Sequence, residues 1–253
     1  MTELAYLADI DQGYVRDFRA RVVALPPGAV ILDRTYFFPT GGGQPADRGT
    51  IVLPDGTRLE VVDVAKSGPS VVHRVKLPRG SAGRPTAGDE IAGAIDWDRR
   101  HRHMRLHTGQ HLLSARIFER TGRRTRKATL SGREAVLELD GRLDDTLREP
   151  LQDDLADAVA RPRTVTIRHV ARAEWDQRPS SARSGLVPLP PQVDPVRVIE
   201  IDGLDTCPCG GTHLRSTGEI GPTALAPVVA LGDGGCRVTL TIHPPPGPSP
   251  PTG

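Results

Sequence analysis

Cysteine is scarce in this chain. Only Cys207, Cys209 and Cys236 occur among 253 residues. An odd and sparse set of cysteines excludes a disulfide-rich scaffold and is typical of proteins that stay in a reducing compartment. We therefore expect a cytoplasmic protein without structural disulfides.

Long apolar runs and a strong charge of either sign are also missing. No apolar run approaches the ~18 residues that a membrane-spanning helix requires. The first residues include Glu3, Asp9 and Asp11 and lack the basic and apolar regions of a signal peptide. The formal net charge is only +2, so the field over the whole protein is mild. We expect no membrane partner, and nothing in the sequence indicates an oligomeric state.

The length allows two compact domains or one large domain. Residues 1–95 contain short β-rich runs separated by turn residues, and Pro54-Asp55-Gly56 gives a hairpin pattern. Many short strands at this spacing predict a small β-barrel-like domain. The expected strands are Arg21–Leu25, Ala29–Asp33, Thr50–Leu53, Arg58–Val64, Val71–Val75 and Glu90–Ile95.

Residues 96–243 mix strands with two helices and are predicted to form a second domain. An amphipathic helix is expected from about His103 to Thr121, with Gly122 as its stop, and another over Asp144–Val159. Strands and helices do not alternate regularly, which indicates a two-layer α/β arrangement and an α+β fold overall. Residues 244–253 are six-tenths proline and are expected to form a disordered tail. The expected strands are Ala135–Leu139, Thr164–Val170, Val196–Ile201, Ala224–Leu231 and Arg237–Ile242, with a loop over Arg178–Asp194.

Two histidines, His107 and His111, stand four residues apart in the first predicted helix. Residues at i and i+4 share one helix face, with Cβ atoms roughly 5–6 Å apart, so two imidazoles can bind one metal ion. About a hundred residues later, Cys209-Gly-Gly-Thr-His213 places a cysteine and a histidine around two glycines. HxxxH alone is weak, because such a pair is more often a solvated face. The two motifs together supply four nitrogen and sulfur ligands of the kind that zinc selects.

These motifs resemble those of a known family. The segments HMRLHTGQHLLSA (103–115), CGGTH (209–213) and TGEIG (217–221) are similar to the editing domain of alanyl-tRNA synthetase and to its free-standing relatives, the AlaX-type trans-editing proteins. The editing domain of threonyl-tRNA synthetase shares the zinc-ligand pattern. Upstream, DRTYFFPTGGGQPADRG (33–49) is like the family's TxFYPxGGGQPxDxG segment. The resemblance implies an N-terminal β-barrel-like domain, an editing domain with zinc, and the metal ligands His107, His111, Cys209 and His213.

The implied activity is hydrolysis of the ester that joins a wrongly attached amino acid to the 3′ end of tRNA. The family's usual targets are serine, and sometimes glycine, on alanine tRNA. Four protein ligands make a closed site, so zinc either activates water or only organises the cleft. Two alternatives stay open: a deacylase of threonine tRNA that carries serine or a threonine analogue, and a non-catalytic tRNA-binding module with a structural zinc. The sequence contains no obvious Ser-His-Asp set, and no aminoacylation domain that would indicate a synthetase.

The resemblance also points to a pocket wall from the N-terminal domain. Thr35 and Gln44 supply polar groups that can read a substrate hydroxyl, although residues of these types near turns often only cap loops. Glycines allow close backbone approach to a ligand, so Gly41, Gly42 and Gly43 are expected substrate contacts. The expected catalytic residues are Thr35, Gln44, His107, His111 and Cys209.

Cys207 occupies a position where family members often have glutamine or another residue. It can act as a spare ligand, as a thiol that lines the pocket, or as a small buried hydrophobe. We expect it to contact the substrate rather than the metal.

Basic residues cluster between Arg99 and Lys127, where ten Arg or Lys residues accompany one acid, Glu119. A basic cluster beside a candidate active site indicates a polyanionic partner, although a solvated helix face gives the same pattern. The expected partner is tRNA, bound through its aminoacylated 3′ end. The residues expected to contact it are Arg105, Arg123, Arg124, Arg126 and Lys127.

Overall fold

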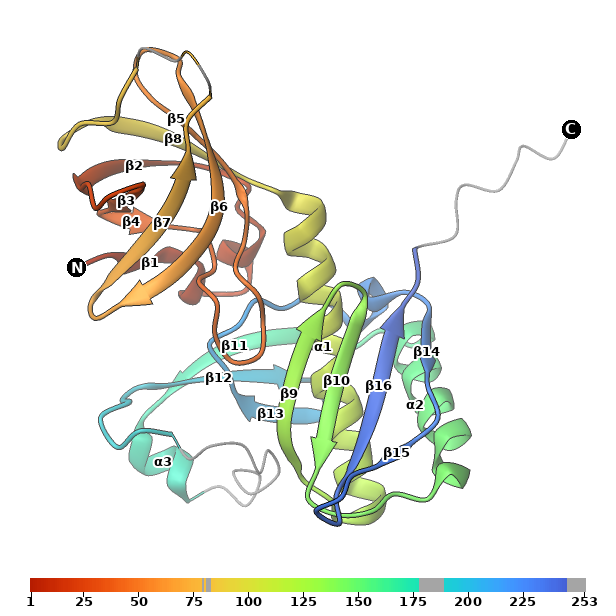
Figure 1. Cartoon of the computed structure of the whole chain (residues 1–253). Helices are drawn as coiled ribbons and strands as arrows, with labels where there is room; N and C mark the ends of the chain where they lie inside the picture. Colours follow the sequence, from red (N-terminus) through yellow and green to blue (C-terminus); the bar gives the residue numbers. More distant parts are fainter. Residues whose placement is uncertain (79, 81–82, 178–188, 245–253) are drawn as a thin grey trace, which may run out of the picture.

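Six strands near the start of the chain close into a barrel in the order β2-β3-β7-β6-β5-β8 (Figure 1). The computed structural model describes residues 1–78, 80, 83–177 and 189–244. Alternate residues of β2 and β6 are buried, as expected for strands with one face toward a core. The barrel strands are β2 (Asp17–Ala24), β3 (Ala29–Leu32), β5 (Gly49–Val52), β6 (Arg58–Ser67), β7 (Ser70–Lys76) and β8 (Glu90–Ile95).

Short elements extend this part of the structure. Strand β1 (Glu3–Leu4) pairs in parallel with β4 (Arg34–Thr35), and two 3₁₀ helices follow β1: η1 (Ala5–Leu7) and η2 (Asp11–Tyr14). The aromatic rings of Tyr6, Phe18, Tyr36, Phe37 and Phe38 belong to one apolar cluster with the barrel strands. Few aromatic residues are present in the chain, and most of them are used here.

Helix α1 (Trp97–Thr121) leaves the barrel and runs through the middle of the remaining structure (Figure 1). The Asp96 carboxylate caps it by accepting the Arg99 N–H, at 3.1 Å, and Gly122 ends it with a φ of 70°. The helix therefore begins before the expected His103, because its cap precedes the apolar pattern. Every residue from His103 to Leu113 is buried, so this stretch is enclosed rather than amphipathic.

Sheet, helix and loop enclose α1. One sheet has the order β14-β16-β10-β9, with β15 also paired to β16, and a second has the order β11-β12-β13. Helix α2 (Arg148–Ala160) packs against α1 and β14. The strands are β9 (Thr125–Ser131), β10 (Glu134–Leu139), β11 (Val165–Val170), β12 (Val196–Ile201), β13 (Asp205–Pro208), β14 (Thr223–Leu225), β15 (Val229–Ala230) and β16 (Cys236–Ile242).

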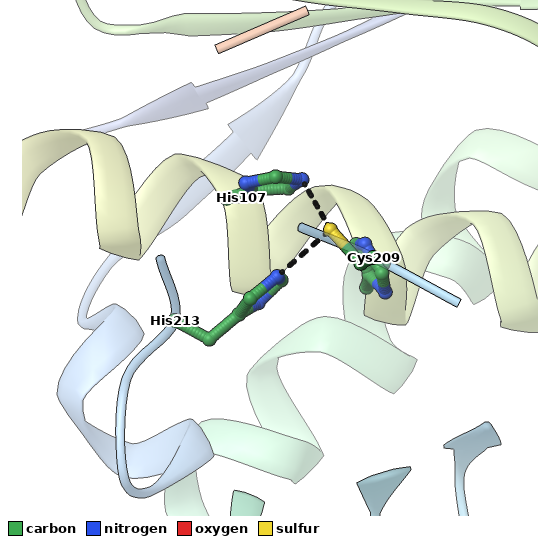
Figure 2. A group of neighbouring side chains, drawn as sticks. His107, Cys209 and His213 are labelled. Atoms are coloured by element: carbon green, nitrogen blue, oxygen red, sulfur yellow. Dashed lines mark hydrogen bonds between the residues drawn. The ribbon is translucent and has the colours of Figure 1, made fainter. Parts of the chain in front are cut away.

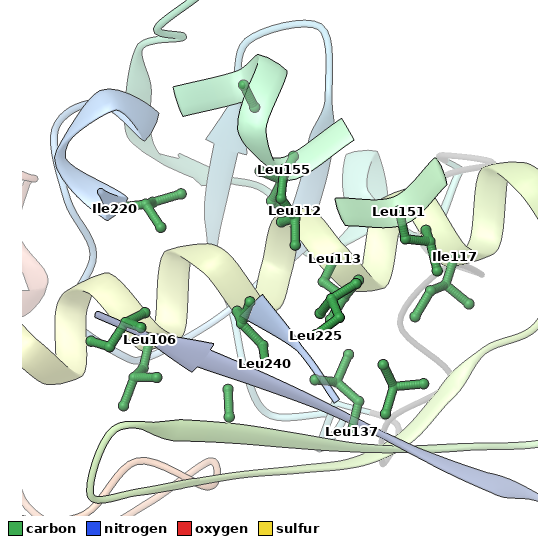
Figure 3. Close-up of a cluster of buried hydrophobic side chains, with 14 of the residues drawn as sticks. Leu106, Leu112, Leu113, Ile117, Leu137, Leu151, Leu155, Ile220, Leu225 and Leu240 are labelled. Carbon is green, nitrogen blue, oxygen red and sulfur yellow. The ribbon is translucent and has the colours of Figure 1, made fainter. Parts of the chain in front are cut away.

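The core between these layers consists almost entirely of aliphatic side chains. Figure 3 shows leucines and isoleucines of α1 meeting those of α2 and of the first sheet. Gly109 lets α1 approach that sheet, since an added Cβ would lie 2.9 Å from Leu240 Cδ2. The labelled members of the core are Leu106, Leu112, Leu113, Ile117, Leu137, Leu151, Leu155, Ile220, Leu225 and Leu240.

The mixed α/β character that we expected is confirmed, but several elements differ. The strand expected over Ala224–Leu231 is two short strands, β14 and β15, because Pro227 between them cannot donate to a ladder. Most of the loop expected over 178–194 and nearly all of the tail expected over 244–253 lie outside the described residues. The elements not expected include β9, β13, α3 (Arg172–Asp176), and the 3₁₀ helices η3 (Asp145–Leu147) and η5 (Thr217–Ile220).

A fully buried ion pair joins the barrel to α1. Arg100, in the first turns of α1, donates from Nε to both carboxylate oxygens of Asp47, at 2.9 and 3.1 Å, and neither side chain is exposed. The same guanidinium donates to the carbonyls of Gly13, at 2.8 Å, and Tyr36. Asp47 in turn accepts the Phe38 N–H, at 2.6 Å. Arg100, which belongs to the basic cluster between Arg99 and Lys127, therefore has a structural role in holding the barrel against α1.

None of the helices in the described part of the chain is long and apolar enough to cross a membrane.

Replacing Asp47 with Asn should lower the free energy of unfolding by ~3–5 kcal/mol, because it leaves the Arg100 charge buried without its partner. Denaturant titration followed by circular dichroism measures the change. Glu90→Gln is the matched control, since Glu90 pairs with Arg21 at 3.0 Å on the surface and such pairs contribute about 0–1 kcal/mol. Equal losses in the two variants would contradict a special role for the buried pair.

Candidate metal centre and cavity

Two distant segments bring four metal-binding side chains together. Helix α1 carries His107 and His111, and the loop after β13 carries Cys209 and His213. Figure 2 shows His107, Cys209 and His213 pointing toward one another. The candidate ligand atoms of all four lie within 4.8 Å of one another. The Cys209 Sγ is 3.5 Å from His107 Nε2 and 3.4 Å from His213 Nε2. Zinc bonds of about 2.0–2.3 Å in a tetrahedron place neighbouring ligand atoms about 3.5 Å apart, so this donor set fits zinc.

Each histidine of the cluster has a hydrogen-bond partner on its other ring nitrogen. His107 Nδ1 donates to Gln44 Oε1 at 2.8 Å, and His111 Nδ1 lies 3.2 Å from an Asp205 carboxylate oxygen. His213 Nδ1 lies 3.2 Å from Thr108 Oγ1. Such contacts fix the tautomer and the orientation of a ligating ring, and leave Nε2 for the metal.

Gln44 has no freedom to swing into the cavity. Its side chain is fully buried, its Nε2 donates to Thr212 Oγ1 at 2.9 Å, and its Oε1 also accepts the Thr212 N–H at 3.2 Å. Gln44 therefore joins the glycine-rich segment of the barrel part to the CGGTH loop and positions His107. It does not line the cavity, which corrects the expectation that it reads a substrate hydroxyl.

Close packing explains two glycines of these motifs. A Cβ on Gly211 would lie 2.2 Å from His107 Cε1, so only glycine lets the loop pass over the ring. Gly43 has a φ of 82°, and a Cβ on it would lie 2.1 Å from the Ala128 carbonyl oxygen. Its carbonyl accepts the Leu130 N–H at 2.8 Å. Gly43 thus docks on β9, where we had expected a substrate contact.

The electrostatics of the cluster favour a thiolate. Burial raises the pKa of Cys209, but the facing imidazoles, His107 first among them, hold this pKa well below its ordinary value. Burial lowers the pKa of His111, yet hydrogen bonds to Asp205 and Cys209 outweigh burial and raise it to about 10. Burial, together with the charge of His107, lowers the pKa of His213. An anionic sulfur therefore faces a protonated His111 in the metal-free cluster, and binding of a metal ion there would release the His111 proton.

A cavity of about 430 Å³ opens directly over this cluster. One wall comes from the first part of the chain and the other from α1, β9 and the Cys209 loop. Lys66, Arg126 and Lys127 contribute positive charge, and none of the described lining residues carries a carboxylate. The lining residues are Tyr6, Phe38, Pro39, Thr40, Gly41, Gly42, Lys66, His107, Gln110, His111, Arg126, Lys127, Ala128, Pro208, Cys209, Gly210 and Gly211.

Thr35 lies inside the barrel part, away from this cavity. Its hydroxyl donates to His73 Nε2 at 2.9 Å and accepts the Phe37 N–H at 3.1 Å, and the side chain is fully buried. His73 Nδ1 donates to the Val30 carbonyl, and burial lowers the pKa of His73 to about 4, so the ring is neutral. Both hydrogen-bonding functions of the Thr35 hydroxyl are thus used within the fold, which corrects its expected role as a pocket residue.

The expected tRNA contacts divide into two groups. Arg126 and Lys127 line the cavity, although Arg126 also pairs with Asp233 at 2.7 Å. Arg105 does not, because its guanidinium is buried and donates to the carbonyls of Ile220, at 2.7 Å, and His243, at 2.6 Å. Arg105, like Arg100, is therefore used inside the fold, which corrects the expectation that it contacts tRNA.

Of the remaining expected contacts, only some line the cavity. Arg123 and Arg124 are exposed and do not line it, and the Arg123 guanidinium lies beside Gly141. Gly41 and Gly42 do line the cavity. Cys207 is buried on β13 and forms a second possible metal-binding group with His111 and Asp205.

Sequence reasoning missed several residues of this site. Asp205 and Thr108 orient ligand histidines, Tyr6 and Lys66 line the cavity, and Arg197 holds the Cys209 loop through a hydrogen bond from the Cys209 N–H to its carbonyl, at 3.1 Å. Thr108 stands inside the HxxxH motif, where a polar residue on a buried helix signals such a contact. The others are isolated in the sequence and carry no comparable signal.

Comparisons with known proteins agree with these motifs. Residues 10–99 match the family model of class II (A) tRNA synthetases, and residues 196–238 match the second additional domain of threonyl and alanyl tRNA synthetases. An alanyl-tRNA editing protein AlaX-M from Methanosarcina acetivorans is 33% identical over 252 residues, which cover 96% of this chain and 99% of that protein. Another from Saccharolobus solfataricus is 33% identical and is covered over its whole length.

A longer protein matches as well. The alanine--tRNA ligase of Pyrococcus abyssi is 34% identical over 231 residues, which cover 89% of this chain but only 24% of the ligase. The match thus falls on one part of the ligase and on nearly all of the AlaX-M proteins. The chain belongs to the AlaX-M family of alanyl-tRNA editing proteins, which is related to alanyl-tRNA synthetase.

Proposed function

We propose that this protein is a zinc-dependent aminoacyl-tRNA deacylase that acts in trans, most favourably on serine or glycine attached to alanine tRNA. The observation that carries the proposal is the His107, His111, Cys209 and His213 cluster at the base of a cavity with cationic walls. The relatives that match over their full length are named alanyl-tRNA editing proteins, which supports the same activity.

In this proposal, two regions of the chain contribute different parts of the site. Residues 96–243, the proposed editing domain, carry all four ligands, while the barrel-containing residues 1–95 provide Gln44, the glycine segment and one cavity wall. The cavity volume falls within the usual range of small-molecule sites, about 300–1,000 Å³. That range suits the aminoacyl ester and part of the terminal nucleoside, with the rest of the tRNA outside.

In this mechanism, the four clustered side chains hold zinc, which when bound polarises a carbonyl or a water molecule. Gln44, Asp205 and Thr108 contact the Nδ1 atoms of the three histidines and keep each ring oriented with its Nε2 toward the metal site. No carboxylate is available among the described cavity residues to act as a general base. The contribution of the chain is therefore to fix the ester near the cluster and to limit access of bulk water.

A structural zinc in a tRNA-binding module is the second candidate, because four protein ligands complete a tetrahedron. The position of the cluster argues for the catalytic reading. Three of its side chains, His107, His111 and Cys209, line the cavity instead of lying wholly inside the core. A deacylase of threonine tRNA uses the same chemistry and differs only in substrate.

The ligand assignment is tested by metal content. Cys209→Ala and His213→Ala should each lose most of the zinc that the wild-type protein retains after dialysis, because each removes one of four donors. Cys207→Ala should keep most of it, since Cys207 belongs to the neighbouring group with His111 and Asp205. Inductively coupled plasma mass spectrometry measures zinc per chain. Full zinc in Cys209→Ala, or loss of zinc in Cys207→Ala, would contradict this assignment and indicate that the ion binds to the neighbouring group of His111, Asp205 and Cys207.

The activity is tested on a panel of charged tRNAs. Seryl- and glycyl-tRNA(Ala) should be hydrolysed, while alanyl-tRNA(Ala) and threonyl-tRNA(Thr) should be spared. A chelator should abolish hydrolysis, and added zinc should restore it. Preferential cleavage of seryl-tRNA(Thr) would shift the proposal to threonine tRNA. If zinc-loaded protein cleaves none of these esters, the deacylase proposal fails and the non-catalytic tRNA-binding module is the remaining candidate.

Contacts with tRNA phosphates are tested by salt dependence. Lys66 and Lys127 line the cavity from its two walls, and neither has an ion-pair partner among the described residues. Changing both to Gln should weaken tRNA binding and reduce the slope of log K against log salt by about 1.4, since one contact to a single strand contributes about 0.7. Lys76→Gln, an exposed lysine outside the cavity, is the matched control. An unchanged slope in the double variant would place the tRNA backbone elsewhere.

A further inference from the structure

Gln110 is the residue of the HxxxH motif that the mechanism above does not use. It stands on α1 three residues after His107 and directly before His111, so its position relative to the metal cluster is set by one rigid helix. Its side chain is only 5% exposed, and it lines the cavity. The small accessible part of Gln110 therefore opens into the cavity.

The Gln110 amide forms no hydrogen bond within the described residues, and its atoms are not among the buried polar atoms that lack a partner, so the amide is accessible from the cavity. Its neighbours along α1, Leu106, Leu112 and Leu113, are fully buried aliphatic residues, so a leucine or methionine would suit this helix better on packing grounds alone. A free donor and a free acceptor at this position indicate that the partner of the amide is a ligand.

Other uncharged polar groups near the cavity are less suited to this role. The Gln44 amide and the Thr35 hydroxyl are used within the fold, as described above. Thr40 is exposed and its hydroxyl accepts the Ala46 N–H, at 3.0 Å. Tyr6 is the nearest rival, because it lines the cavity and its hydroxyl forms no hydrogen bond within the described residues, but a phenol carries its donor and its acceptor on one oxygen, whereas the amide carries them on two atoms.

We propose that Gln110 is a specificity-determining residue, whose amide hydrogen-bonds the side-chain hydroxyl of the amino acid esterified to the tRNA. A hydroxyl both donates and accepts one hydrogen bond, and the Gln110 amide offers the complementary pair. An ester whose side chain lacks a hydroxyl cannot form this pair of hydrogen bonds, so it is stabilised less in the transition state. This inference rests on the proposed deacylase activity.

Gln110→Met tests the inference, because methionine keeps the length and volume of the side chain and removes both hydrogen-bonding groups. The measured quantity is the ratio of kcat/KM for seryl-tRNA(Ala) to kcat/KM for glycyl-tRNA(Ala). We expect this ratio to fall by on the order of tenfold in Gln110→Met. Zinc content should match the wild type, which separates a lost contact from a disturbed cluster. Gln177→Met is the matched control, since Gln177 is exposed and lines no described cavity, and its ratio should be unchanged.

Four outcomes overturn the inference. Equal losses on both esters in Gln110→Met would mean that the amide does not distinguish their side chains. Loss of zinc or a clearly lower melting temperature in both Gln110→Met and Gln110→Glu would assign Gln110 to support of the helix. A shift of the ratio in Tyr6→Phe without one in Gln110→Met would transfer the role to Tyr6. An unchanged ratio in every variant would leave selectivity to the shape of the cavity. If the wild-type protein itself cleaves neither ester, the proposed deacylase activity fails first.

Discussion

The buried pair of Arg100 and Asp47 is the contact on which the rest of the structure depends. Charges taken out of water are stable only when every donor and acceptor is matched. Here the matching groups come from η2, from the segment after β4 and from α1, so satisfying one guanidinium fixes the relative positions of all three. Asp47 follows Gln44 by three residues, and Arg100 precedes His107 by two helical turns. The pair therefore brings Gln44 within reach of the His107 ring.

The site consists of the four candidate ligands, of residues that orient those ligands, and of glycines that allow the segments to pack closely. The four clustered side chains come from α1 and the CGGTH loop, but the groups that orient them come from three different regions. Gln44, Asp205 and Thr108 are all buried, and each is held by the fold around it. Glycines at 43 and 211 allow the close approaches that bring these regions together. Chemistry sets the identity of the inner residues, and packing sets that of the glycines.

The four side chains that the sequence assigned to a metal lie together in the structure, whereas several residues that it assigned to the substrate do not line the cavity. His107, His111, Cys209 and His213 are brought together, since short motifs with fixed spacing encode local geometry. Thr35, Gln44 and Arg105 were assigned to the substrate, yet each is used inside the fold, because the partners His73, Thr212 and Ile220 lie far away in the sequence. Strand β9 was missed because its sequence, TRKATLS, does not alternate apolar and polar residues throughout, and its burial does not alternate throughout either. Hydrogen bonds between residues far apart in the chain, such as that between Gln44 and Thr212, leave no periodic pattern in a sequence.

The order of the site residues along the chain has a consequence for biosynthesis. Gln44 leaves the ribosome first, the two histidines of α1 follow, and Cys209 and His213 come roughly a hundred residues later. The histidine pair of α1 is thus made long before its thiolate partner exists. The last ligands arrive on a loop that passes over a ring already oriented from the N-terminal side. The candidate metal-binding group is accordingly complete only after the CGGTH loop has been made and has packed against α1, so a metal ion held by all four side chains would be bound late in maturation.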